Sequence, residues 1–246
     1  MGVLCPSCSD DETYVPTGGF PGPGPNEVLV AAGDGAAYYI DRYEVTRKAY
    51  AAWLSTHPYT GIQPAGCSDN DDFTPTCRWP AAADEEDHPV VCVDWCDAYA
   101  YCQVFGQRLC GQIGGGANDY HTYSDPDLDQ WYNACSAGGV DEYPYGSPYD
   151  PHTCNGGLHG RGTTAPVGSL PGCRSATGLL DMSGNIREWK DACENDPTNT
   201  VAFNYCRLGG GSFRDGELRH LTCESPGQDA FRAGHWDSIG FRCCRD

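Results

Sequence analysis

The sequence has little positive charge and no long apolar run. Its 246 residues include 15 Lys and Arg against 34 Asp and Glu, which gives a formal net charge of −19. A chain this acidic repels phosphate backbones, so we expect no nucleic-acid partner. No stretch of about 18 apolar residues occurs, so we expect no membrane span. The surplus carboxylates suit hard cations such as calcium, and they equally suit an acidic surface.

Several motifs of catalysis and metal binding are also missing. No Gly-x-Ser-x-Gly nucleophile motif occurs. The glycine-rich segment 111–116 lacks the Lys-Ser/Thr ending of a phosphate-binding loop, and we interpret it as a surface loop. Only Cys5 and Cys8 have the Cys-x-x-Cys spacing that zinc proteins repeat. One group has residues of the types that bind metals: His152, Cys154 and His159. A disulfide and two surface histidines explain this group as well as a metal site does.

Cysteine is abundant, with 16 residues spread along the chain. In a reducing cytosol so many thiols are an oxidation liability, whereas outside the cell an even number forms a disulfide framework. We therefore expect an exported protein that is secreted, periplasmic or at the cell surface, with its signal peptide removed. Cys5 is a candidate site for a lipid anchor. Spacing alone predicts two disulfides, Cys193–Cys206 and Cys67–Cys77, the second within a long loop at residues 57–89.

Glycine and proline, with 32 and 18 residues, favour turns and short elements. The Pro- and Gly-rich run at residues 16–25 suits neither a helix nor an interior strand, so we expect residues 1–26 to form a flexible tail. Residues 27–246 are then expected to form one domain. Apolar patterns predict short strands at residues 28–30, 37–40 and 90–93. Periodicity and capping residues predict helices at residues 47–55, 95–105 and 127–135.

Several sequence blocks occur in the order typical of one family. The most specific is Asp-Met-Ser-Gly-Asn-Ile-Arg-Glu-Trp at residues 181–189. With this block the chain resembles the formylglycine-generating, or sulfatase-modifying factor, family over about residues 27–246. All the blocks that carry the resemblance lie at residues 41–46, 88–95, 97–102, 106–109, 143–146, 165–168, 178–189, 209–213 and 240–242.

The resemblance implies an α+β fold related to C-type lectins. Such a fold is irregular, with few helices and short strands, and here it is expected to be disulfide-rich. The resemblance also implies two disulfides, Cys102–Cys243 and Cys135–Cys223.

The resemblance further implies a chemistry that this chain does not support. Formylglycine-generating enzymes oxidise a substrate cysteine with oxygen, using copper(I) held by two thiolates, which are soft ligands. The two thiolates follow a Gly-Gly-Ser-aromatic block, here at residues 210–213, and at their positions stand Asp215 and His220. We therefore expect neither copper nor oxidase activity. We interpret Asp215 and His220 as solvated loop residues rather than as a new acid–base pair.

One metal site does carry over by resemblance. Residues 181–188 resemble a family calcium loop, whose ligands would be the side chains of Asp181 and Glu188 and the carbonyls of Gly184 and Ile186. A second family calcium site is less well matched. Asn155 fits it, but the loop is shortened, and His159 or Gly160 stands near the expected aspartate.

These observations favour an exported scaffold or recognition module without catalytic activity, stabilised by disulfides and calcium. Loops at residues 57–89, 111–126 and 214–238 would display a surface for an extracellular protein or glycan. Two alternatives stay open: a copper oxidase with a displaced thiol site, and an enzyme of unrelated chemistry on the same fold. The displaced site would use Cys223, Cys243 and Cys244. Several residues of the last loop suit an anionic or carbohydrate partner, and scattered surface residues explain them equally well: Arg214, Arg219, Arg232, His235 and Trp236.

Overall fold

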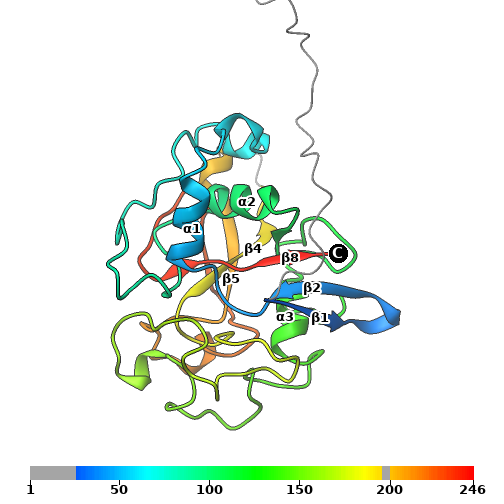
Figure 1. Ribbon diagram of the computed structural model, residues 1–246. Coiled ribbons are helices and arrows are strands. Elements are labelled where there is room, and N and C mark those ends of the chain that lie inside the picture. The colour runs from blue at the N-terminus through cyan, green and yellow to red at the C-terminus, as the bar shows by residue number, and fades with distance from the viewer. Residues whose placement is uncertain (1–25, 196–199) are drawn as a thin grey trace, which may run out of the picture.

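The computed structural model describes residues 26–195 and 200–246. The expected tail up to residue 25, with the candidate anchor Cys5, lies outside the described residues. Within the described ranges, regular elements are short and are separated by long loops, as the glycine and proline content predicts (Figure 1). None of the helices in these ranges is long and apolar enough to cross a membrane.

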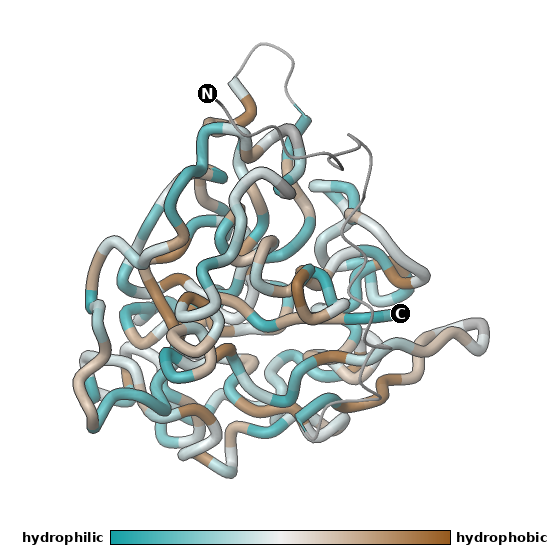
Figure 2. Tube along the Cα trace, turned by 45° about the horizontal axis from the view of Figure 1, so that its top comes forward, coloured by the Kyte–Doolittle hydropathy of each residue, from teal (hydrophilic) through white to brown (hydrophobic). Residues whose placement is uncertain are grey.

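The first four-stranded sheet brings together segments from both ends of the domain. Strands β1 (Glu27–Ala31) and β2 (Ala37–Asp41) form a hairpin, which confirms the two strands predicted there. Strand β8 (Cys243–Arg245) lies between β2 and β3 (Arg108–Leu109), so the order is β1-β2-β8-β3 and every pair is antiparallel. The turn of the hairpin projects from the body of the molecule (Figures 1 and 2).

The second sheet has the order β6-β5-β4-β7. Its strands are β4 (Arg187–Cys193), β5 (Tyr205–Gly209), β6 (Asp229–Phe231) and β7 (Ile239–Gly240). Strand β7 runs parallel to β4, whereas the other pairs are antiparallel. This parallel pair places the start of β4 beside β7, with Arg187 opposite Ile239 and Glu188 opposite Gly240.

Capping side chains begin the two longer helices as the sequence predicts. Helix α1 (Arg47–Leu54) starts at Thr46, whose Oγ1 accepts an amide N–H of the first turn at 3.1 Å. Helix α2 (Trp95–Val104) starts with a capping box, in which the Asp94 and Asp97 carboxylates each accept the other residue's amide N–H. Reciprocal capping satisfies two amide groups that the helix itself cannot pair.

An aromatic cluster packs α1 against α2. Tyr50 and Tyr101 are stacked with ring centroids 5.6 Å apart, and Phe241 meets Tyr101 edge-on at 5.4 Å. Contacts of this kind are worth about 0.5–1.5 kcal/mol beyond the area they bury. Figure 2 shows hydrophobic and hydrophilic stretches alternating over short distances along the trace, which agrees with many short elements each contributing a few core residues.

Seven disulfides cross-link the described residues. They include three pairs that the sequence predicted: Cys102–Cys243, Cys135–Cys223 and Cys193–Cys206. Two pairs join cysteines for which no partner was predicted: Cys110–Cys244 and Cys154–Cys173. This number of disulfides fits an extracellular or secreted protein, because such bonds persist in oxidising compartments.

The predicted pair Cys67–Cys77 is wrong. Cys67 is bonded to Cys96 and Cys77 to Cys92. The loop at residues 57–89 is therefore not closed on itself but is bonded once to the first turn of helix α2 and once to the segment that precedes this helix. Spacing along the chain favours pairs of cysteines that are close in sequence. It does not show that the loop folds back and contacts the helix.

Two predicted elements also differ. Residues 90–93 do not form a strand, because Cys92 adopts a left-handed conformation (φ 63°) that interrupts extended backbone before Asp94. The helix predicted at residues 127–135 is shorter, spanning Gln130–Cys135 as α3. Asp129 is its cap, accepting the Tyr132 amide N–H at 2.7 Å, so the preceding residues remain in a turn.

Candidate functional site

Asp215 lies in the loop after β5, at the position where the family resemblance expects the first thiolate. Its carboxylate is only 7% exposed. One oxygen, Oδ2, accepts the Ser212 amide N–H and hydroxyl, both at 2.8 Å. The other, Oδ1, accepts from Arg187 Nη2 at 2.5 Å. Asp215 is therefore a buried, fully engaged carboxylate, and its interpretation as a solvated loop residue is wrong.

His220 lies at the position expected for the second thiolate. Its Nδ1 is 3.5 Å from Oδ1 of Asp215, so the structure brings the two predicted positions together. The Ser212 hydroxyl donates to Asp215 and not to the imidazole. A histidine that activates a serine needs a direct hydrogen bond to its hydroxyl. This cluster is therefore not arranged as a nucleophile with its base.

The alternative thiol site is not formed by the described residues. Cys223 is bonded to Cys135, Cys243 to Cys102, and Cys244 to Cys110. The remaining cysteines of the described ranges are also in disulfides. Cys5 and Cys8 lie outside these ranges. A copper(I) site needs free thiolates, and residues 26–195 and 200–246 contain none.

The predicted calcium loop forms a tight turn immediately before β4. Asp181, Gly184 and Asn185 all have positive φ, at 61°, 75° and 59°. A Cβ at Gly184 would lie 2.6 Å from main-chain atoms of Asn155, so only glycine fits there. The predicted ligands on this turn are thus held by an unusual backbone path that is packed against the Asn155 segment.

Glu188, the last predicted ligand, is bound to an arginine. Arg242 donates to Glu188 from Nε and Nη2, each at 2.7 Å, and the Trp131 indole N–H adds a bond at 2.8 Å. The two charged side chains are 0% and 1% exposed. Each carboxylate oxygen has two lone pairs, so these bonds leave some acceptor capacity for a cation.

Two further carboxylates lie within the electrostatic reach of this ion pair. Burial raises the pKa of Asp181 to about 6, and Glu188 adds to the effect. Burial also raises the pKa of Glu44, with Asp181 as the next contributor. Glu44 accepts from the Asn185 side chain at 2.5 Å and from an amide N–H of the loop.

The charges of this buried cluster do not balance. With all of its groups ionised, the three carboxylates of Glu44, Asp181 and Glu188 contribute −3 and Arg242 contributes +1, which gives −2. Buried charges are normally paired or bound to a metal. A divalent cation would neutralise the excess, and the oxygen ligands are those calcium prefers. The residues of the loop therefore fit the predicted ion in charge and in ligand type.

At the second family calcium site, a buried side-chain oxygen of Asn155 has no hydrogen-bond partner among the described residues. Within the described ranges, Oδ1 of Asn155 is buried without a hydrogen-bond partner, whereas its Nδ2 donates to Thr163 and Asn185. Nδ1 of His159 is likewise buried without a partner in this part of the chain. Cys154 is in a disulfide, so the trio of ligand-type residues at 152–159 is reduced to its histidines.

Sequence reasoning missed one group of three metal-type side chains. Asp94, Asp97 and His235 have ligand atoms within 4.8 Å of one another. The two carboxylates are close because they form the capping box of α2, and burial together with Asp94 raises the pKa of Asp97. Two aspartates three residues apart at a helix start were visible in the sequence, but the approach of His235 from the C-terminal loop was not.

The basic residues of the C-terminal loop do not form one cationic surface. Arg214 pairs with Asp237, and Arg219 pairs with Glu217. Arg232 instead lies over the ring of Trp95, 4.3 Å from its centroid. Each charge is therefore engaged locally, which gives no support to an anionic partner at this loop.

Comparison with known proteins identifies two kinds of relative: proteins named as enzymes, and proteins named as inactive. A formylglycine-generating enzyme from Thermomonospora curvata is 26% identical, with 85% of this chain and 82% of that protein aligned. The protein named inactive C-alpha-formylglycine-generating enzyme 2 of Bos taurus is 27% identical over 63% of this chain and 49% of its own length.

Solved structures agree on the fold. CarF superposes with a TM-score of 0.57 at 22% identity, covering 89% of this chain and 97% of that one. PvdO from Pseudomonas aeruginosa superposes with a TM-score of 0.56 at 20% identity, covering 89% and 91%. The family model of the sulfatase-modifying factor enzyme 1-like domain matches residues 12–246. The chain therefore belongs to the sulfatase-modifying factor family and has the fold of formylglycine-generating enzymes.

Proposed function

We propose that this chain is a non-catalytic, exported member of its family, which serves as a rigid recognition module. One observation carries the proposal: Asp215 and His220 occupy the expected thiolate positions, and Asp215 is committed to Ser212 and Arg187. The disulfides of the described ranges leave no thiolate pair there for copper(I). The similarity to a bovine protein named inactive supports the same conclusion.

Calcium is the second part of the proposal. The ion would be held by the Asp181 and Glu188 carboxylates and the Gly184 and Ile186 carbonyls. Its role is structural, because it would neutralise the excess charge of the buried Glu44, Asp181 and Glu188 cluster. Disulfides and calcium together would hold the frame on which the long loops display a surface for an extracellular protein or glycan.

The alternative function, a copper-dependent oxidase, is tested by a direct activity assay. The protein is incubated in air with copper(I) and a peptide that carries the substrate cysteine, and mass spectrometry follows conversion of the cysteine side chain to an aldehyde. The formylglycine-generating enzyme of Thermomonospora curvata is the positive control. We expect conversion by the control and none by this chain. Conversion by this chain would overturn the proposal and restore the oxidase with a displaced thiol site.

A further inference from the structure

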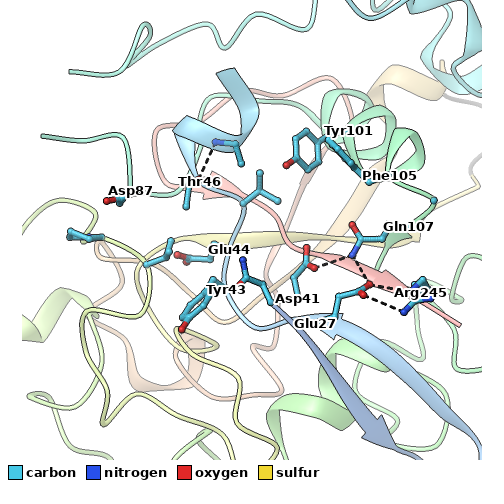
Figure 3. Close-up of a pocket in the computed structure, with 16 residues that line it drawn as sticks. Glu27, Asp41, Tyr43, Glu44, Thr46, Asp87, Tyr101, Phe105, Gln107 and Arg245 are labelled. Carbon is cyan, nitrogen blue, oxygen red and sulfur yellow. Dashed lines mark hydrogen bonds and ion pairs between the residues drawn. The ribbon is translucent and has the colours of Figure 1, made fainter. Parts of the chain in front are cut away.

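A cavity of about 760 Å³ opens beside the β1–β2 hairpin, away from Asp215 and His220. It lies between strand β2, the end of helix α2 and the loop at residues 166–167. Pockets of about 300–1,000 Å³ are the size at which proteins enclose small ligands or a few residues of a peptide. Figure 3 shows its charged and aromatic lining residues, which come from both ends of the domain.

Acidic side chains outnumber basic ones in the lining. Four carboxylates face the cavity, and Arg245 is the one cationic side chain among the described residues that line it. Arg245 is already engaged with Glu27, at 3.1 and 3.2 Å. Asp41 and Asp87 form no ion pair with Arg245. Glu44 also lines the cavity, but it belongs to the buried cluster around Asp181 and accepts from Asn185 and Ile186 there.

Aromatic rings flank these carboxylates. Figure 3 shows Tyr43 on one side of Asp41, and Tyr101 with Phe105 on the other. Phe105 is 47% exposed, although it lies at the end of a well-packed helix. Aromatic faces attract ammonium and guanidinium groups, and carboxylates at the same site add a direct charge attraction.

We propose that this cavity binds a lysine or arginine side chain of a partner polypeptide. The proposal rests on the recognition role given above and assigns a surface to it. Charge complementarity selects this occupant, since Asp41 and Asp87 line the cavity in addition to the Glu27–Arg245 pair. The volume exceeds that of one side chain and leaves room for the residues on either side.

The chain's own N-terminal segment is a poor match for the cavity. Asn26 lies at the rim, so the preceding residues are near enough in sequence to compete. Residues 1–25 contain no lysine or arginine, however, and they include Asp10, Asp11 and Glu12. Charge repulsion therefore disfavours this segment and favours a basic segment of another chain.

The proposal is tested by NMR titration of the full-length, ¹⁵N-labelled protein with a blocked glycine-flanked arginine peptide. A peptide with citrulline in place of arginine is the neutral control of the same shape. We expect the arginine peptide to shift amide signals of residues at the cavity and to bind about tenfold more tightly than the citrulline peptide.

Two substitutions at the rim have matched controls outside the cavity. We expect Asp87→Asn to weaken binding about two- to fivefold and Asp84→Asn, also exposed in the same loop, to leave it unchanged. Phe105→Ala should weaken it about two- to fivefold, whereas Val104→Ala, at a similarly exposed neighbour, should not. All four side chains are at the surface or half-exposed, so the variants are expected to fold.

Three results would overturn the proposal: equal binding of both peptides, no binding of either, or contacts between the cavity and the chain's own first 25 residues in the free protein. Weakened binding in the two control variants would also overturn it. None of these results bears on the copper assay. Oxidase activity with intact peptide binding would refute the proposed function and leave the cavity as a binding site.

Discussion

Arg242 and Glu188 form a two-bond ion pair in the interior, in which Nε and Nη2 of the guanidinium each lie 2.7 Å from a carboxylate oxygen. Arg242 also donates to the carbonyls of Asp41, Arg42 and Leu180. One side chain thus connects the end of the β1–β2 hairpin, the residue that precedes the predicted calcium loop, and strand β4. The pair is formed where the two sheets of the domain approach each other.

Loss of this arginine should be strongly destabilising. Arg242→Met leaves Glu188 buried without its partner, and we expect a loss of about 3–5 kcal/mol in the free energy of unfolding. Urea unfolding measures the change. Arg219→Met removes an exposed pair with Glu217 and should cost less than about 1 kcal/mol. Equal losses in the two variants would show that the buried pair has no special role.

The buried carboxylates predict an unusual response to pH when calcium is removed. Burial raises the folded-state pKa of Asp181 to about 6, above the value of about 3.9 in an unfolded chain. The folded state then binds more protons than the unfolded state in this range, so stability should fall as pH rises from about 4 to about 6. The pKa of Glu44, also raised by burial, acts in the same direction.

Calcium should remove most of that fall in stability. The ion favours the charged form of Asp181, so the unfolding temperature near neutral pH should rise when calcium replaces a chelator. Asp181→Asn should lose the response, whereas Asp84→Asn, an exposed carboxylate, should keep it. Thermal unfolding with and without chelator measures both effects. An unchanged midpoint in the unsubstituted protein would reject the calcium site.

The closeness of Asp215 and His220 predicts what two thiols would do there. Their side-chain atoms are 3.5 Å apart, so the double variant Asp215→Cys/His220→Cys should hold copper(I) or form a new disulfide. Each single variant should do neither. Copper titration and thiol counting measure the result, and two free thiols without copper binding would refute the assignment of these positions.

Loss of the Arg187 and Ser212 bonds should lower stability by about 1–3 kcal/mol in every variant that lacks Asp215.

The disulfides should differ in their contribution to stability. Cys102–Cys243 encloses a separation of 141 residues and Cys77–Cys92 one of 15. Chain entropy predicts a loss of about 5 kcal/mol for the first pair and about 3 kcal/mol for the second when both cysteines become serine. Denaturant unfolding of the two double-serine variants compares them. A larger loss for the short loop would contradict the entropic account.

Local features of the fold could be predicted from the sequence, whereas contacts between segments far apart in the chain could not. Thr46 and Asp94 marked helix starts because an N-cap acts through neighbours three residues away. The partner of Cys67 is Cys96, which depends on a loop folding back onto α2. The three pairs predicted correctly were two implied by the family and one that joins neighbouring strands.

At the candidate site, too, the local features could be predicted and the long-range contacts could not. The replacement of both thiolates could be read directly from residues 210–220. The burial of Asp215 could not, because its partner Arg187 comes from the start of β4, 28 residues earlier in the chain. The charge excess around Asp181 also required the structure, since Glu44 and Arg242 approach it from opposite ends of the domain.

The central claim, that no thiolate pair is available for copper, is tested most directly by alkylating the denatured, non-reduced protein and mapping the adducts by mass spectrometry. We predict no adduct on any cysteine in residues 26–246, in agreement with the seven disulfides. Two adducts on Cys223, Cys243 or Cys244 would contradict the account and make an oxygen-dependent copper oxidase the better explanation of this chain.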